Sequence, residues 1–184
     1  MNRLEARRIV ITGGPSSGKT TLLNHLETLG HPCLHEISRE VIKEAQERGI
    51  EQLFLTNPIL FSELLLEGRL AQFRQATAQR EPVLFYDRGL PDVTAYLDYV
   101  GTHYPDQFAE TCRNHRYDTV FLLPPWPEIY TQDNERYESF EQAQKIHSFL
   151  YDAYLGYGYT VHEVPRGPVD TRVTHILDTL ARGL

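Results

Sequence analysis

The segment from Gly13 to Thr20 constrains the fold most, because it is a complete phosphate-binding loop of the form G-x-x-x-x-G-K-[ST]. Glycines let the backbone curl so that successive N–H groups and a helix N-terminus point at one anion. The motif predicts a nucleoside triphosphate site in which Lys19 reaches the β- and γ-phosphates and Thr20 holds Mg²⁺. The residues expected to contact the nucleotide here are Gly13, Gly14, Pro15, Ser16, Ser17, Gly18, Lys19, Thr20 and Thr21.

Size and charge restrict the class of protein. The chain has 184 residues, of which 41% are hydrophobic, and this is enough for a single domain with a real core. Its formal net charge is −7 and its basic residues are scattered, which argues against nucleic acid as a partner. No window approaches the roughly 20 apolar residues of a membrane span. Cys33 and Cys112 are too few for a disulfide framework, so we expect reduced thiols and a cytoplasmic location.

Strand-like and helix-like segments alternate along the chain, which is typical of an α/β fold whose parallel sheet is covered on both faces. We expect strands at 9–12, 31–37, 82–87, 118–124 and 159–164. We expect helices from the phosphate loop to about 29, and at 38–48, 58–79, 91–100, 105–115, 139–155 and 169–180. Ser38 is expected to cap the second helix, and Ser139 to open the sixth through a capping box.

Charged residues follow two of these strands. Asp87 and Arg88 end the third strand, and Glu36 follows the second. Because parallel strands of a doubly wound sheet end at one crevice, we expect these side chains to face the γ-phosphate. Asp87 is then a magnesium ligand, partly through water, and Arg88 a clamp on phosphate oxygens. Glu36 can take a proton from an acceptor hydroxyl, and Arg39, one turn later, can bind the acceptor.

Simpler explanations compete with these assignments. Asp87 can cap the next helix, and Glu36 can be stabilised by the dipole of the helix that follows it. Arg39 and Arg88 can be solvated surface residues. Arg88 nevertheless argues against an ATP-driven motor of the AAA+ kind, since such proteins usually place Glu directly after the magnesium-binding Asp to activate water.

The stretch 125–138 is the one long irregular segment, and a loop of this length is usually functional or mobile. We interpret it as a lid in which Arg136 neutralises charge on the transferred phosphoryl group. Trp126 and Tyr130 are expected to anchor its hinge against the sheet. The alternative for Arg136 is a solvated loop residue.

Five segments in order carry a resemblance to a known family: 13–22, 36–40, 87–92, 121–126 and 133–136. Together they resemble the AAA domain family related to ribosylnicotinamide kinase and to the TRPL translocation defect protein. The resemblance implies a P-loop kinase type of fold, with five parallel strands in the order 2-3-1-4-5, helices on both faces and a lid. Similarity to deoxynucleoside and thymidylate kinases supports the roles given to Glu36, Asp87, Arg88 and Arg136. Gly89 departs from those kinases, which often have Ser at that place.

These observations favour a small-molecule kinase that transfers the γ-phosphate of ATP to a nucleoside-like acceptor. A regulatory nucleotide-binding module with slow hydrolysis is an alternative, as is a toxin-like, phage-like or stress-associated ATPase of the same fold. GTP stays open beside ATP, since the lack of an N-K-x-D motif argues only against a conventional GTPase. Arg166, in the loop after the fifth strand, is expected to contact the nucleotide. The acceptor and the oligomeric state, a homodimer included, stay open.

Overall fold

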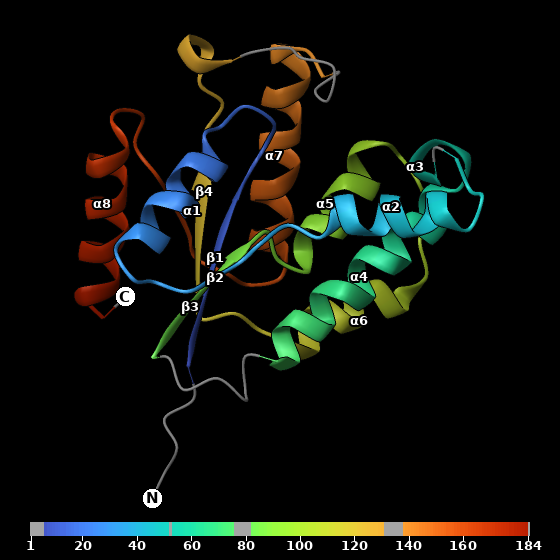
Figure 1. The fold of residues 1–184 in the computed structure, drawn as a ribbon, viewed down its shortest axis with the longest axis horizontal. Helices are drawn as coiled ribbons and strands as arrows, with labels where there is room; N and C mark the ends of the chain where they lie inside the picture. The colour runs from blue at the N-terminus through green and yellow to red at the C-terminus, as the bar shows by residue number, and fades with distance from the viewer. Residues whose placement is uncertain (1–5, 52, 76–81, 131–137, 184) are drawn as a thin grey trace, which may run out of the picture.

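The fold is built around a parallel sheet of five strands in the order β2-β3-β1-β4-β5. The computed structural model describes residues 6–51, 53–75, 82–130 and 138–183 (Figure 1). The strands are β1 (Arg7–Gly13), β2 (Cys33–Leu34), β3 (Val83–Asp87), β4 (Thr119–Leu123) and β5 (Val161–Glu163). The order implied by the family resemblance is therefore confirmed, and it places the strand that precedes the phosphate loop at the centre of the sheet.

Helices cover both faces of the sheet, as Figure 1 shows, with α1 and α8 on one side and α4 to α7 on the other. The helices are α1 (Lys19–Thr28), α2 (Ser38–Glu47), α3 (Leu53–Thr56), α4 (Pro58–Gln75), α5 (Pro91–Tyr99), α6 (Asp106–Asn114), α7 (Phe140–Gly156) and α8 (Val169–Ala181). In β1, Ile9 and Ile11 pack toward α1 and α8, while Val10 packs toward the opposite helices. This alternation follows from the period-two geometry of a strand.

Two local expectations are wrong. β2 is two residues long instead of spanning 31–37, since Pro32 offers no N–H to the sheet and α2 already begins at Ser38. Ser38 is the first residue of α2 and its side chain does not cap the helix. The carboxylate of Glu36 does so, since its Oε1 accepts hydrogen bonds from the backbone N–H groups of Ile37 and Ser38 at 3.0 and 3.2 Å.

Other start signals act as expected. Asn57 precedes α4 and its Oδ1 accepts a hydrogen bond from the N–H of Leu60 at 3.1 Å. Ser139 and Gln142 form the capping box that opens α7. The short helix α3 was not expected from the sequence. In the part of the chain that the structure describes, no helix is both long enough and apolar enough to cross a bilayer.

Candidate active site

The phosphate loop connects the end of β1 to the start of α1 and is held tightly by its neighbours. A Cβ on Gly13 would lie 2.8 Å from the backbone oxygen of Leu123 in β4, and a Cβ on Gly14 would lie 3.3 Å from that of Ala143 in α7. Gly18 has a left-handed φ of 80° directly before α1. These positions need glycine because the backbone approaches other elements or adopts a conformation that side chains disfavour.

Arg88 follows the last residue of β3 and has a left-handed backbone with φ 70°. Its N–H donates to the oxygen of Ile11 in β1 at 3.0 Å. Its guanidinium is 15% exposed and lies over the ring of Tyr96, 5.3 Å from the centroid. A non-glycine residue in this region costs about 1–3 kcal/mol, and such residues cluster at functional sites.

Glu36 receives two arginine side chains. Arg88 Nε lies 2.5 Å from Oε2, and Arg69 Nη2 lies 3.0 and 3.2 Å from the two carboxylate oxygens. Burial alone would raise the pKa of Glu36, but the charges of Arg69 and Arg88 outweigh it and lower this pKa to about 2. Glu36 is therefore ionised at neutral pH, and it both caps α2 and belongs to the charged cluster.

Arg69 was missed by sequence analysis, although it is only 4% exposed. It lies on α4 on the same face as the buried residues Leu65 and Leu66, and its Nη1 donates to the oxygen of Gly89 at 3.2 Å. A charged residue at helical spacing from buried leucines was the available signal, because a buried arginine needs a partner.

Asp92 is a second residue that sequence analysis did not single out, and its side chain is completely buried. It accepts hydrogen bonds from the hydroxyls of Thr12 and Tyr154, both at 2.6 Å, and from the N–H of Gly89 at 2.9 Å. Its Oδ1 also lies 3.3 Å from Nη1 of Arg88. One carboxylate thus ties β1, the turn after β3 and α7 together, directly before the phosphate loop.

The residue after Arg88 is glycine for a steric reason, because a side chain there would collide with its neighbours. A Cβ on Gly89 would lie 2.6 Å from the hydroxyl oxygen of Tyr154 and 3.0 Å from the ring of Tyr117. Tyr154 is itself held by its hydrogen bond to Asp92. The departure from the serine of nucleoside kinases therefore follows from the buried tyrosine that fills this position.

Lys19 and Asp87 lie next to this cluster and influence each other's ionisation. Burial and the charge of Arg88 lower the pKa of Lys19 to about 8, against the opposite effects of Asp87 and Glu36. Burial raises the pKa of Asp87, against Lys19 and Arg88. Four sequence-predicted residues, Lys19, Glu36, Asp87 and Arg88, are therefore brought together at the carboxyl edge of the sheet.

The donor set at Asp87 fits Mg²⁺. Asp87 is 9% exposed, and its buried Oδ1 has no hydrogen-bond partner among the described residues. A carboxylate oxygen of this kind is a ligand that Mg²⁺ prefers, usually together with waters. Thr20 is exposed in the first turn of α1, where its hydroxyl can join such a site.

The remaining candidates lie outside this cluster or outside the described residues. Thr21 is exposed at the start of α1, and Arg39 is exposed in the first turn of α2. Arg166 is exposed after β5 and lines a cavity of about 480 Å³ together with Pro125 and Glu163. Arg136 lies in 131–137, which the structure does not describe, so its expected role is untested.

The described start of the stretch 125–138 contacts the helices α7 and α8. It contains the short 3-10 helix η2 (Pro127–Ile129). The guanidinium of Arg172 in α8 lies over the ring of Trp126, 5.6 Å from its centroid. The ring of Tyr130 packs edge-on against Phe140 of α7. Both aromatic residues thus hold this segment to helices on either side of the phosphate loop.

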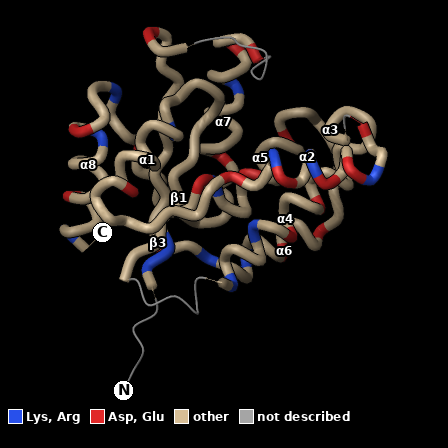
Figure 2. Tube along the Cα trace, in the orientation of Figure 1, with Lys and Arg blue, Asp and Glu red and all other residues tan. Residues whose placement is uncertain are grey.

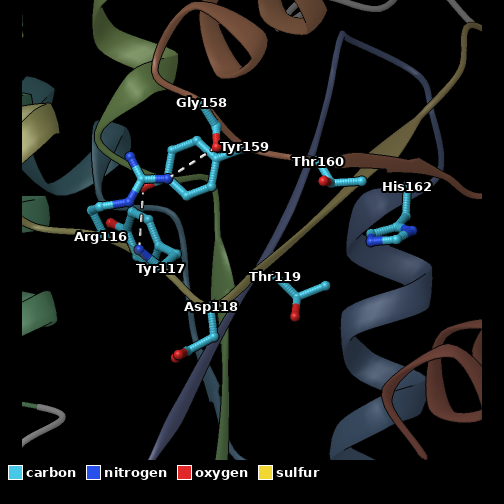
Figure 3. A pocket seen from close by; sticks show the side chains of 8 residues that line it. All are labelled: Arg116, Tyr117, Asp118, Thr119, Gly158, Tyr159, Thr160 and His162. Atoms are coloured by element: carbon cyan, nitrogen blue, oxygen red, sulfur yellow. Dashed lines mark hydrogen bonds between the residues drawn. The ribbon is translucent and has the colours of Figure 1, made fainter. Parts of the chain in front are cut away.

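A further cavity of about 290 Å³ lies at the amino ends of β4 and β5, at the opposite edge of the sheet (Figure 3). Arg116 lines it and donates to the backbone oxygens of Tyr157 and Gly158 at 2.5 and 3.2 Å, with its guanidinium over the ring of Tyr159. These contacts tie the turn after α7 to β4.

In Figure 2 the Lys and Arg segments are distributed over several elements, with Asp and Glu among them.

Comparisons with known proteins agree with this fold. A family model described as AAA domain matches residues 8–172. No curated protein matches the chain by sequence. Deoxyadenosine kinase from M. mycoides, solved with dCMP and dCDP, superposes with a TM-score of 0.70 at 16% identity, over 95% of this chain and 99% of that one.

Two further solved structures are similar. NadR in complex with NR has a TM-score of 0.75 at 20% identity, over 98% of this chain and 52% of that one. Thymidylate kinase from Ehrlichia chaffeensis has a TM-score of 0.64 at 14% identity, over 95% of this chain and 98% of that one. At these identities the likeness shows a shared fold.

Proposed function

The chain belongs to the AAA domain family, and from this premise we propose that it is a phosphotransferase. It binds a magnesium nucleoside triphosphate at the phosphate loop and transfers the γ-phosphate to a hydroxyl of a nucleoside-like acceptor. The observation that carries the proposal is the meeting of Lys19, Glu36, Asp87 and Arg88 beside that loop. The kinase folds of the similar structures support it at the level of fold.

Lys19 and Arg88 neutralise the negative charge of the phosphoryl group. Phosphoryl transfer needs positioning and charge neutralisation more than covalent help from the protein. Lys19 binds the β- and γ-phosphates, and Arg88 reaches the transferred group from the end of β3. Glu36 and Asp92 hold the guanidinium of Arg88 before the nucleotide arrives. A cation that is already held beside the site only has to exchange Glu36 for the phosphate, so little ordering is left for the reaction itself.

Magnesium fits the same edge of the sheet. Asp87, with its unpartnered Oδ1, and Thr20 would hold the ion. When bound there, Mg²⁺ would supply positive charge that offsets the charge of the phosphates and of the leaving diphosphate. Asp87 has its pKa raised by burial in the free protein, so a nearby cation favours its ionised form.

Glu36 binds the acceptor hydroxyl and takes its proton. The acceptor oxygen bonds to the γ-phosphorus as the bond to the β–γ bridging oxygen breaks, and the electron pair of that bond leaves with the nucleoside diphosphate. The hydroxyl proton passes to the carboxylate of Glu36 and then to solvent. With a pKa of about 2, Glu36 is a weak base while Arg88 is paired with it. Arg88 moving onto the phosphate removes one positive neighbour and raises the pKa of Glu36.

A regulatory triphosphate-binding module is the second candidate, and one observation favours it. The carboxylate of Glu36 already accepts hydrogen bonds from Arg69 and from the backbone of Ile37 and Ser38, in addition to its ion pair with Arg88. A protein that only binds and slowly hydrolyses a triphosphate has no need to release this carboxylate for an acceptor.

Binding is tested first, by the thermal midpoint of the protein with ATP, GTP, CTP or UTP, each with and without Mg²⁺. We expect a magnesium-dependent rise for wild type and its loss in Lys19→Ala, which removes charge-assisted hydrogen bonds worth about 1.5–3 kcal/mol each. Lys145→Ala, an exposed lysine on α7, is the matched control. An equal rise in wild type and Lys19→Ala would show that the phosphate loop is not the site.

A further inference from the structure

Arg172 is a buried cation without a carboxylate partner among the described residues. It lies on α8 and is 3% exposed, and its Nη2 donates to the backbone oxygen of Ser17 in the phosphate loop at 2.9 Å. Its Nε is buried with no hydrogen-bond partner. Burial of this guanidinium lowers its pKa. Since burying an unpaired charge is costly, a position that keeps one is expected to have a use beyond holding the fold.

Trp126 covers this guanidinium. It lies three residues after the end of β4 and is half-buried, so the residue is partly accessible to solvent. The centre of the Arg172 guanidinium lies 5.6 Å from the ring centroid. A few residues further on, Ile129 would contact a Cβ placed on Gly18 at 3.3 Å. The segment after β4 and helix α8 therefore meet against the outer side of the phosphate loop.

The order of the strands indicates which end of the triphosphate lies on which side of the central strand β1. Glu36, Asp87 and Arg88 lie at the ends of β2 and β3, on one side of the central strand β1. With the γ-phosphate on that side, the nucleoside end points toward the other side, where β4 and β5 end. Trp126 and Arg172 are an aromatic and a cationic group in contact with each other on this side of the loop.

We propose that Trp126 is the surface on which the base of the triphosphate stacks, and that Arg172 is the positioning residue that holds Trp126 against the phosphate loop through Ser17. This inference rests on the proposed triphosphate binding and names its nucleoside subsite. Stacking uses the π-face that every base has, so the subsite accepts triphosphates of all four common nucleosides. The two larger purine rings bind more tightly than the pyrimidines.

The test compares nucleotides with inorganic tripolyphosphate, which fills the loop but has no base. Trp126 is the only tryptophan in the chain, so its emission reports on stacking directly. We expect Mg-ATP, Mg-GTP and Mg-CTP to quench this emission in wild type and tripolyphosphate to leave it unchanged. In Trp126→Ala the affinity for ATP, measured by calorimetry, falls about 5- to 150-fold while that for tripolyphosphate stays the same. Trp126→Phe restores most of the affinity for ATP.

Arg172→Met separates positioning from folding. Because the guanidinium is buried and unpaired, we expect the thermal midpoint of the nucleotide-free variant to equal or exceed that of wild type, while ATP binds more weakly and tripolyphosphate does not. Arg182→Gln, an exposed arginine at the end of the same helix, is the matched control and changes neither. A lower midpoint with an unchanged ratio of the ATP and tripolyphosphate affinities would overturn the role given to Arg172.

The outcomes distinguish the two proposals. If wild type binds both ligands, but Trp126→Ala weakens them equally or not at all, the stacking subsite is wrong and triphosphate binding stands. If wild type binds neither ligand, the proposed function is wrong and the subsite falls with it.

Discussion

Nε of Arg88 lies 2.5 Å from Oε2 of Glu36, so the candidate phosphate clamp and the candidate acceptor-binding carboxylate neutralise each other in the nucleotide-free protein. Arg69 holds the other side of the same carboxylate. A bound triphosphate competes with Glu36 for Arg88, while Arg69 keeps Glu36 in place. Arrival of the phosphate and release of the carboxylate are therefore coupled through a single arginine.

The ion pairs of Glu36 make stability depend on acid pH. Its pKa is lowered from 4.5 to about 2 in the folded protein, so the folded state binds this proton less readily than the unfolded state. The stabilisation is complete above about pH 4.5 and is lost as pH falls toward 2. We expect urea unfolding to show a steeper loss of free energy of unfolding over this range in wild type than in Glu36→Gln. Parallel curves for the two proteins would contradict the ion-pair role.

Lys19 makes triphosphate affinity depend on alkaline pH. Its pKa is about 8 in the free protein, and bound phosphate favours the charged ammonium. Above that pH binding must take up a proton, so the affinity falls by up to about tenfold per pH unit. Calorimetry at pH 8.5 in two buffers of different ionisation enthalpy should detect this uptake. An affinity that does not change up to the pKa of a free lysine would exclude the lowered value.

Asp87→Asn is expected to separate stability from magnesium use. Burial raises the pKa of Asp87, which shows that its charge is unfavourable in the free protein, so the amide should raise the thermal midpoint without nucleotide. The same change removes a ligand charge, so more Mg²⁺ is needed for half-maximal triphosphate binding. A titration with Mg²⁺ at fixed ATP measures this. An unchanged magnesium requirement would remove Asp87 from the metal site.

Gly89→Ser introduces the residue that nucleoside kinases often have, and here it should destabilise the fold. Its Cβ would lie 2.6 Å from the Tyr154 hydroxyl, and overpacking of this kind costs about 1–3 kcal/mol. Tyr154→Phe removes that oxygen and its hydrogen bond to Asp92. In a double-mutant cycle measured by urea unfolding, the pair should lose less free energy than the sum of the single changes. If the effects of the two changes simply add, contact with the Tyr154 hydroxyl is not what requires glycine at position 89.

Local motifs predicted the phosphate-binding end of the molecule well. The G-x-x-x-x-G-K-[ST] loop, the capping box at Ser139 and the alternation of strands and helices depend on neighbouring residues, and the structure has each of them. Glu36, Asp87 and Arg88 could be grouped because parallel strands end at one edge. The strand order came from family resemblance, since no local pattern encodes which strands are neighbours.

The residues that were missed depend on distant packing. Arg69 reaches Glu36 from 33 positions along the chain, and Tyr154 reaches Asp92 from 62. Sequence spacing gives no sign of such pairs until the helices are placed. The capping role of Ser38 was predicted wrongly because α2 begins one residue earlier than a cap at Ser38 requires, with Ile37 at the N-cap position. The carboxylate of Glu36 accepts from the N–H groups of Ile37 and Ser38 instead.

The partition of the γ-phosphate between acceptor and water tests the proposed phosphotransferase most directly. Labelled ATP is incubated with Mg²⁺ and a panel of nucleosides and sugars, and labelled product is counted against free phosphate, in wild type and in Glu36→Gln. We predict that an acceptor raises nucleotide consumption well above the water background. Glu36→Gln should keep ATP affinity while transfer falls by about 10²-fold or more. Consumption that no acceptor raises, and that Glu36→Gln leaves unchanged, would contradict the kinase and favour the regulatory module.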